Sequence, residues 1–446
     1  MVRKLFTILI KNKYLIQELD HLAKSVIRFA LRYNLPQLAA VVCYSRTKVL
    51  KDGEKRPNVL CLSKSFFNED VKALCKFGNK FNYCLFPRLY LNTICSFFIS
   101  SFDSLNDGNY HIKVNDNHNI HKLRTFLYRL LIHYKRLNKF DVVLAGNFVY
   151  TQQQELFLVL KELGIPSVVI YKEGMFPVSR YDEMIEKIYK TKEFRADKIL
   201  FYNNKIRDTL IKARIPGLVE EKTVVVGIPR FDFYRLNDVK EENNTIVLFS
   251  FEPKVKASYL LNDKQRQNEF VAFADHFHKM FAMFISTNPE YRLIVKTKPS
   301  ESAVAYASKM FGPYVDKMKD RLEIIANVSA ERLVKRASFV AAFSSTTLIE
   351  GLILDKILIC PNVKEMIGNE AFDILYPYNG LATYVSSVDA LQETIESRRS
   401  DFKEKRDVER VKYLESMVHE PFSNSSEVVE NELLKLLESR LSSGGN

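Results

Sequence analysis

The chain has 446 residues, 47% of them hydrophobic, and a formal net charge of +13 at pH 7. That length and apolar content suit a protein that buries the cores of two or more domains. No run of 18 or more apolar residues is found, so no membrane-spanning helix is predicted, and the N-terminal segment lacks a signal-peptide cleavage site. The six cysteines are scattered without a CxxC pair. We therefore expect reduced thiols in a cytoplasmic protein, and neither a zinc site nor a disulfide framework.

The positive charge is concentrated at the start of the chain. Residues 1–60 contain twelve basic and four acidic residues, a net charge of +8. Such an excess favours a polyanionic partner. No helix-turn-helix, RRM or zinc-finger pattern accompanies it, which argues against nucleic acid. An anionic inner-membrane surface suits this basic, apolar-rich region better, and the alternative is a solvated charged surface.

Helical and strand patterns alternate along the chain, as in open parallel sheets covered by helices. The pattern predicts a helix at Lys13–Tyr33, ended by Pro36, and then a strand at Leu38–Tyr44. The polar stretch 236–245 reads as a linker. We therefore predict an N-terminal Rossmann-like domain (1–238), a C-terminal one (239–390), and helices at 391–446 that pack back on the first domain. Further strands are expected at Asn58–Leu62, Asn82–Phe86, Asp141–Leu144, Ser167–Tyr171, Lys198–Tyr202, Lys222–Val226, Thr245–Phe249, Arg292–Lys296 and Leu322–Ile325.

Two loops of the first half follow predicted strands, where open parallel sheets bind ligands. Gly146 and Asn147 follow the strand at Asp141–Leu144, and Glu173 and Gly174 follow the strand at Ser167–Tyr171. A carboxylate on such a loop can act as general base toward an incoming hydroxyl. Glu173 is thus the candidate catalytic residue, and a solvated loop glutamate is the alternative.

The most informative stretch is Phe339–Pro361, which predicts a strand, a turn, a helix and a second strand. Four hydroxyl residues form the turn: Ser344, Ser345, Thr346 and Thr347. Their hydroxyls, together with the free N–H groups that begin the helix, favour an anion such as a phosphate. Glu350, one turn into the helix, can accept hydrogen bonds from a ribose. A plain helix cap is the alternative.

Other candidate residues stand at strand ends. Ser250 follows the strand at Thr245–Phe249, and Lys298 follows Arg292–Lys296, where it can contact a phosphate. Arg230 can pair with Asp232 to shape its loop or face a phosphate. His276 and His278 are two residues apart and do not share a helix face, so no metal spacing arises.

These motifs carry a resemblance. Gly227–Asp232 resembles the G-x-P-R-x-D stretch that precedes the second domain of bacterial surface-carbohydrate transferases. Phe343–Glu350 resembles the donor-phosphate turn and ribose-binding glutamate of the GT-B glycosyltransferases. Asp355-Lys356 stands where that superfamily commonly has Gly-Lys-Pro. The likeness spans scattered motifs over residues 140–365. It points to capsule and lipopolysaccharide biosynthesis, with CDP-glycerol glycerophosphotransferases as relatives.

The resemblance implies two Rossmann-like domains, with mostly parallel sheets, facing across a cleft. A nucleotide-sugar donor would bind the C-terminal half, and a glycan or lipid-linked acceptor would bind the N-terminal half. It also implies no cofactor and no metal, because helix N-termini and basic side chains neutralise the leaving diphosphate. One departure is Lys298, which stands where several relatives have the histidine of Lys-x-His-Pro.

Three other functions stay open. The Ser344-Ser345 pair also fits a glycerophosphotransferase, which would release CMP. A non-hydrolysing UDP-sugar 2-epimerase shares the fold and the ribose glutamate, although the paired carboxylates and histidine that it needs are not found. A non-catalytic module that binds glycan or membrane is the third.

Overall fold

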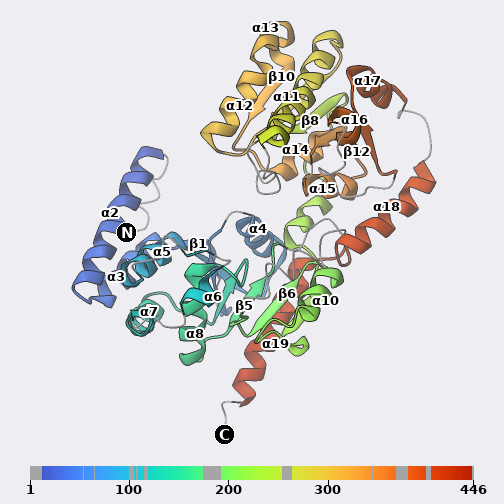
Figure 1. Cartoon of the computed structure of the whole chain (residues 1–446). Helices are drawn as coiled ribbons and strands as arrows, with labels where there is room; N and C mark the ends of the chain where they lie inside the picture. The colour runs from blue at the N-terminus through green and yellow to red at the C-terminus, as the bar shows by residue number, and fades with distance from the viewer. Residues whose placement is uncertain are drawn as a thin grey trace. The chain divides into compact units, whose positions relative to one another are not determined.

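The computed structural model describes residues 13–53, 55–64, 66–99, 105–106, 109–114, 119–173, 192–253, 264–343, 345–367, 380–397 and 403–443 (Figure 1). Two of the predicted site residues, Gly174 and Ser344, lie outside these ranges. The chain forms two compact units. Unit 1 comprises Met1–Met175, Arg180–Asp232 and Ser423–Asn446, and the main segment of unit 2 is Phe233–Phe422.

Unit 1 is built on a seven-stranded sheet in the order β1-β3-β2-β4-β5-β6-β7. All neighbouring strands are parallel except β1, which pairs with β3 in the antiparallel sense. The residues of β4 and β5 are all buried, as expected for strands covered by helices on both faces. The strands are β1 (Lys48–Lys51), β2 (Asn58–Leu62), β3 (Asn82–Phe86), β4 (Val142–Ala145), β5 (Ser167–Ile170), β6 (Lys198–Phe201) and β7 (Thr223–Val225).

Helices pack on this sheet and on one another. The helices are α2 (Lys13–Arg32), α3 (Pro36–Arg46), α4 (Phe67–Phe77), α5 (Leu89–Phe98), α6 (Tyr110–Lys113), α7 (Asn119–Leu137), α8 (Gln154–Glu162), α10 (Asn204–Lys212) and α19 (Ser425–Ser443), with 3-10 turns at η2 (Thr151–Gln153), η4 (Glu220–Lys222) and η5 (Pro229–Arg235). The strand predicted at Leu38–Tyr44 is wrong, because these residues lie within α3. Pro36 begins this helix at its first turn, where a proline costs no hydrogen bond.

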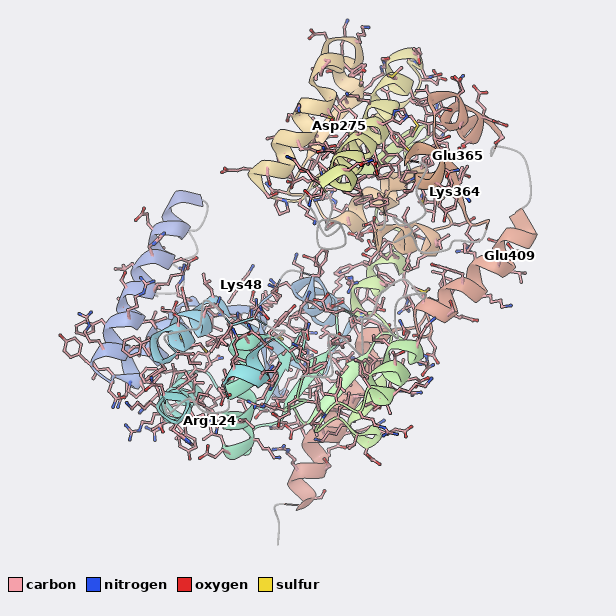
Figure 2. The ribbon with its side chains drawn as sticks, in the orientation of Figure 1. Lys48, Arg124, Asp275, Lys364, Glu365 and Glu409 are labelled. Carbon is pink, nitrogen blue, oxygen red and sulfur yellow. The ribbon has the colours of Figure 1, made fainter. Side chains whose placement is uncertain are left out.

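A buried ion network joins three helices of unit 1. The Glu155 side chain on α8 is 2% exposed and accepts from the Tyr110 hydroxyl of α6 at 2.5 Å. It also accepts from Arg124 of α7 (labelled in Figure 2), and from Arg195 Nη1 at 2.9 Å. Burial alone would raise the pKa of this carboxyl, but the hydrogen bonds from Arg124 and Tyr110 and the charge of Arg195 lower it. Glu155 is therefore an ionised link between α6, α7, α8 and the segment before β6.

The C-terminal helix α19 belongs to unit 1, where it packs against α4. Asp232 is 1% exposed, and its carboxylate accepts the first backbone N–H groups of α19, from Ser425 at 3.0 Å and Ser426 at 2.8 Å. Further along, Glu430 accepts from the backbone of Asn79 at 2.7 Å and from the hydroxyl of Tyr83 at 2.8 Å. The units divide after Asp232, the domain boundary was predicted after residue 238, and α19 is part of unit 1.

Unit 2 is built on six parallel strands in the order β10-β9-β8-β11-β12-β13. The strands are β8 (Thr245–Phe249), β9 (Arg292–Lys296), β10 (Leu322–Ile325), β11 (Phe339–Ala342), β12 (Ile357–Pro361) and β13 (Ala382–Val385). The helices are α11 (Lys264–Thr287), α12 (Glu301–Phe311), α13 (Val315–Met318), α14 (Ala330–Arg336), α15 (Thr347–Ile353), α16 (Val363–Ile367), α17 (Val388–Ser397) and α18 (Lys403–Met417), with 3-10 turns at η6 (Gly312–Tyr314) and η7 (Lys319–Arg321).

Helices cover both faces of this second sheet. Phe277, Phe281 and Ile285 of α11 are fully buried in one core cluster with residues of the strands and of α17. On the other face α15 lies close to the sheet: a side chain at Gly351 would place its Cβ 2.7 Å from Leu358 of β12. Each unit is thus an α/β layer structure with mostly parallel strands, which confirms the predicted fold class.

Two findings concern the whole set of described residues. No described helix is long and apolar enough to cross a membrane. All six cysteines carry free thiols, and each is buried except Cys75, which is partly exposed.

Candidate functional site

The strand order of unit 2 fixes where a ligand can bind. The chain runs from β8 outward through β9 to β10 and then returns to the other side of β8 as β11. In open parallel sheets, the crevice for a ligand opens at the carboxyl ends of the two strands where the order reverses. In unit 2 these are β8 and β11, whose ends are in register at Phe249 and Ala342. Ser250 and Ser345 follow these ends, so the strand order brings together two residues that were separately predicted to bind the nucleotide donor.

The hydroxyl turn after β11 has local order of its own. The side-chain oxygens of Ser345 and Thr347 are 2.8 Å apart, and the Thr347 backbone N–H donates to Ser345 Oγ at 3.3 Å. Thr347 is 9% exposed, whereas Ser345 and Thr346 are partly exposed. This hydroxyl-rich turn therefore leads from β11 into α15, and the side chains of Ser345 and Thr346 are accessible there.

Glu350 lies in the first turn of α15. Its side chain is buried on α15, and its Oε2 accepts from the hydroxyl of Tyr234. A carboxylate has about four acceptor positions, so it can accept from more than one hydroxyl. Tyr234 orients Glu350, a role that the sequence motif did not suggest.

Ser250 is held by a buried histidine. His278 is fully buried, with Nδ1 2.7 Å from the carbonyl of Ala274 and Nε2 2.9 Å from Ser250 Oγ. Because a carbonyl only accepts, Nδ1 carries the proton and Nε2 accepts from the Ser250 hydroxyl. Burial lowers the pKa of His278 to about 4, so the ring is neutral at pH 7. Ser250 therefore presents lone pairs to a ligand and suits a ligand hydroxyl better than a phosphate.

A cluster of aromatic side chains packs next to the carboxyl ends of β8 and β11. The rings of Phe251 and Phe343, which follow β8 and β11, have centroids 4.9 Å apart. They pack with Phe270 and Phe273 of α11 in one cluster. This apolar packing fixes the two loops relative to each other.

Lys298 is exposed beyond β9. Lys296, two residues earlier at the end of β9, donates to the carbonyls of Thr297 at 2.6 Å and Ala326 at 3.0 Å. Burial lowers the pKa of Lys296. Lys296 thus links the ends of β9 and β10, and a phosphate contact by Lys298 stays a prediction.

Arg230 belongs to unit 1, unlike the other residues that were predicted to bind the nucleotide donor. Its Nη1 donates to Asp70 Oδ1 at 3.1 Å and to the Tyr202 hydroxyl at 2.8 Å. The Asp70 side chain is fully buried, and Asp232, the other end of the motif, caps α19. The described contacts of the G-x-P-R-x-D stretch thus hold unit 1 together, and a donor contact by Arg230 stays a prediction.

The predicted acceptor residues of unit 1 follow β4 and β5. A side chain at Gly146 would place its Cβ 2.7 Å from the side chain of Phe67, so only glycine allows this close approach. Asn147 is 3% exposed, and its Oδ1 accepts from the Val149 backbone at 3.0 Å. Both residues shape the loop that carries Tyr150, instead of facing solvent themselves.

Glu173 lies beside Tyr150. Its Oε1 accepts from Lys172 Nζ at 2.6 Å and from the Tyr150 hydroxyl at 3.3 Å, and its side chain is 38% exposed. Burial, followed by the charge of Glu173, raises the pKa of Tyr150, so the phenol stays protonated and donates. The candidate base is thus accessible and is oriented by Lys172 and Tyr150, neither of which the sequence identified as its partner.

Comparisons with known proteins agree with the motifs. A family model described as capsule polysaccharide biosynthesis protein matches residues 258–362. This segment contains Lys298, Ser345 and Glu350, and the match confirms the resemblance to surface-carbohydrate biosynthesis proteins over this part of the chain. No curated protein matches the sequence.

Solved structures similar to the chain come from several bacteria. A glycosyltransferase from Rickettsia africae is 14% identical and covers 87% of this chain and 99% of its own, with a TM-score of 0.43. A UDP-GlcNAc 2-epimerase from Neisseria meningitidis bound to UDP-GlcNAc is 12% identical, with coverages of 85% and 100% and a TM-score of 0.45. Anabaena HepE in complex with UDP and glucose is 11% identical, with coverages of 86% and 100% and a TM-score of 0.40. At these levels the neighbours assign no activity to this chain.

Proposed function

We propose that the protein is a glycosyltransferase of cell-surface polysaccharide biosynthesis. It moves a sugar from a nucleotide-activated donor to a glycan or lipid-linked acceptor. The observation that carries this proposal is the coincidence at one switch point of the hydroxyl turn Ser345–Thr347, the buried Glu350 and the capsule-family match. Such a crevice is where parallel sheets bind nucleotides.

Each residue has a part in the proposed reaction. The hydroxyls and N–H groups of the turn at Ser345–Thr347, with Lys298, stabilise the departing diphosphate, which is the task of preorganised donors. Glu350 accepts from the ribose, and Glu173 removes the proton of the acceptor hydroxyl as the new glycosidic bond forms. Because these groups supply the electrostatic stabilisation, we propose that transfer needs neither metal nor cofactor, and EDTA should leave the rate unchanged.

The first test is nucleotide binding. Thermal unfolding of the pure chain is measured with UDP, GDP, CMP, CDP, dTDP and ADP. A ligand at 100 times its Kd stabilises the folded state by about 2.7 kcal/mol, a shift of several degrees. Ser345→Ala should abolish the shift, whereas Ser338→Ala, at the opposite end of β11, should keep it. The proposed nucleotide site is refuted when no nucleotide shifts the unfolding temperature. It is also refuted when the nucleotide shifts the unfolding temperatures of Ser345→Ala and Ser338→Ala equally.

Product analysis separates the activities. With the sugar form of the nucleotide that binds, transfer releases a nucleoside diphosphate only when acceptor is present. CMP released from CDP-glycerol would identify a glycerophosphotransferase, and conversion of UDP-GlcNAc without acceptor would identify an epimerase. Glu173→Gln should lower kcat about a hundredfold or more while nucleotide binding persists. A near-normal kcat in this variant would remove Glu173 as the base.

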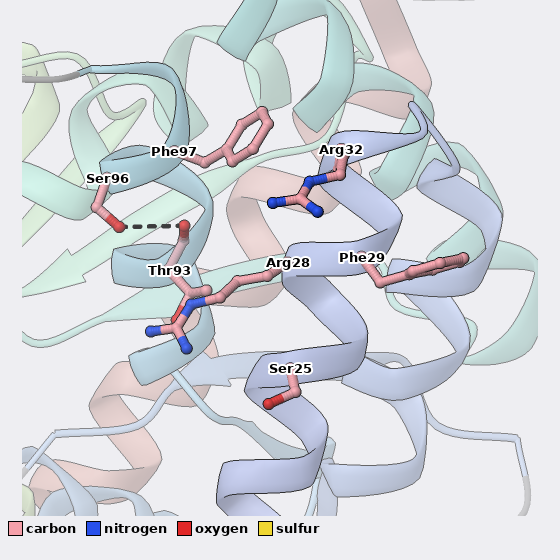
Figure 3. A pocket seen from close by; sticks show the side chains of 7 residues that line it. All are labelled: Ser25, Arg28, Phe29, Arg32, Thr93, Ser96 and Phe97. Carbon is pink, nitrogen blue, oxygen red and sulfur yellow. Dashed lines mark hydrogen bonds between the residues drawn. The ribbon is translucent and has the colours of Figure 1, made fainter.

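We further propose that unit 1 docks on an anionic membrane from the cytoplasmic side through α2 and α5. Leu22 and Phe29 of α2 are 60% and 52% exposed, and Tyr33, which directly follows α2, is 59% exposed. The rings of Phe29 and Tyr33 lie 4.6 Å apart. Arg28 and Arg32 reach from α2 toward α5 and line a pocket of about 470 Å³ (Figure 3). Exposed aromatics beside arginines on an amphipathic helix are typical of interfacial binding.

Flotation with liposomes tests this docking. Vesicles of anionic and of neutral lipid are compared for the wild-type protein and for the double variant Arg28→Glu/Arg32→Glu. The matched control, Lys161→Glu/Lys212→Glu, changes the same charge on exposed positions of α8 and α10. Binding to anionic vesicles that only the first variant loses supports docking, and equal behaviour on both lipids refutes it.

A further inference from the structure

A cluster of basic side chains surrounds Tyr150 at the carboxyl edge of the unit 1 sheet. Lys64 follows β2, Arg88 follows β3, Tyr150 lies in the loop after β4, and Lys172 follows β5. The strand order β3-β2-β4 makes the ends of β2 and β4 the switch point of this sheet. Ligands of open parallel sheets bind at this point, so the cluster occupies the place of a second binding site.

The three cations converge on one ring. Arg88 Cζ lies 4.3 Å from the centroid of Tyr150, Lys64 Nζ lies 5.3 Å from it, and Lys172 Nζ lies 5.9 Å from it. These distances are within the range of cation–π attraction. Tyr150 is 7% exposed and its hydroxyl donates to Glu173, so burial and this hydrogen bond hold the ring in place beside the cations. Lys64, Arg88, Lys172 and Glu173 together carry a formal charge of +2.

An exposed aromatic side chain borders the cluster. Phe66 is 63% exposed, and its ring centroid lies 5.8 Å from Lys172 Nζ. Its backbone has φ 62° and ψ −50°, a conformation that costs a non-glycine residue free energy and that occurs preferentially at functional sites. Lys172 Nζ thus lies at similar distances from the rings of Phe66 and Tyr150. Phe66 offers an apolar face that a sugar ring can cover, next to cations that can bind an anion.

We infer that the acceptor is an anionic sugar whose phosphate or carboxylate is bound by Lys64, Arg88 and Lys172. This inference rests on the proposed transfer activity. Arginine binds phosphate and carboxylate in a bidentate manner, and lysine adds point charges. Glu173 belongs to the same cluster, at 2.6 Å from Lys172 Nζ. An anion bound by the cations therefore brings an acceptor hydroxyl into the neighbourhood of the candidate base.

The test measures sugar binding with the nucleotide site saturated by the nucleotide that shifts the unfolding temperature. Glucose 1-phosphate, glucuronate and methyl glucoside are titrated by calorimetry into the full chain. We expect the phosphate or the carboxylate sugar to bind at least tenfold more tightly than the neutral one, and the stronger of the two identifies the acidic group. Binding should weaken as salt is raised.

Variants locate the site. Lys64→Gln and Arg88→Gln should each weaken anionic sugar binding at least tenfold, and Arg88→Lys should restore part of it. The control is Lys48→Gln, an exposed lysine on β1 in the same sheet (Figure 2), which should bind as the wild type does. An unchanged unfolding temperature and circular dichroism spectrum show that each variant is folded.

The outcomes separate this inference from the proposed function. Equal binding of charged and neutral sugars, no binding of any probe, or binding unaffected by Lys64→Gln and Arg88→Gln overturns the anionic acceptor while nucleotide binding stands. When no nucleotide binds, the titration is run without one. Anionic sugar binding that the two variants lose then supports the site, although the transferase has failed.

Discussion

Replacing Glu155 by glutamine should destabilise unit 1 by about 3 kcal/mol, because it removes the carboxylate of a buried ion pair while keeping its shape. The Arg195 side chain is 10% exposed, so it loses the charge of Glu155 with little access to water, and its contact with Glu193 at 2.9 Å remains. Arg124 is 35% exposed and can turn toward water, which holds the cost near the lower end of the range for broken buried pairs. For a unit of this size the loss corresponds to about 6 to 12 °C in Tm.

The dependence on pH has a definite sign. The pKa of Glu155 is lowered in the folded state, so its stabilisation is present above the unfolded value, about 4.3, and is lost as the pH falls through the folded value. The difference between wild type and Glu155→Gln should thus be constant from pH 7 to 5 and shrink below about pH 4.

Urea unfolding, with hydrogen exchange of peptides from α7 and α8, measures this difference in unit 1. Glu162→Gln, an exposed position on the same helix, is the control. A difference of less than about 0.5 kcal/mol between the two variants, the usual range for surface changes, would refute a stabilising buried ion pair at Glu155.

Two further predictions concern packing and protonation. Gly78→Ala should loosen α19, because the new Cβ would lie 2.3 Å from the Glu430 carboxyl. Limited proteolysis should then remove the C-terminal helix faster than in the wild type. The control Gly312→Ala, whose new Cβ would have no neighbouring atom within 4 Å, should be cleaved at the wild-type rate. The folded pKa of His278 is about 4, below the usual 6.5, so the unfolded chain takes up the proton first as the pH falls. This uptake should lower the unfolding free energy of the wild type by up to about 3 kcal/mol between pH 7 and 4. His278→Gln should remove this contribution and flatten the curve. His276→Gln, exposed on the same helix, should keep the wild-type slope, and parallel curves for both variants would contradict the assignment.

The fold of unit 2 could be predicted from the sequence because its strands are short apolar runs between clear turn signals. The strand predicted at Thr245–Phe249 is β8, and the one at Arg292–Lys296 is β9. The strand–turn–helix–strand reading of Phe339–Pro361 corresponds to β11, α15 and β12. Parallel strands buried on both faces leave such a record in sequence.

The region of α3 shows where the same rule fails. Leu38–Cys43 is a short apolar run next to a proline, and such a run cannot be told from a buried helix by periodicity. In the structure α3 packs between α2 and α7, so apolar residues lie on more than one of its sides and the helical period is obscured. Pro36, at the first turn of α3 and two residues before this run, was the signal that favoured a helix.

The cluster around Tyr150 could not be found by inspecting motifs, because its members come from four strand ends spread over more than a hundred positions. Taken singly, Lys64 or Arg88 reads as one more surface cation of a basic chain. Both become informative only after the strand order places β3, β2 and β4 side by side. Glu173 was identifiable from its loop alone, yet the residues that orient it, Lys172 and Tyr150, are defined by distance. A candidate site whose residues come from separate strand ends therefore has to be derived from topology first, and only then from the chemistry of the residues that the topology brings together.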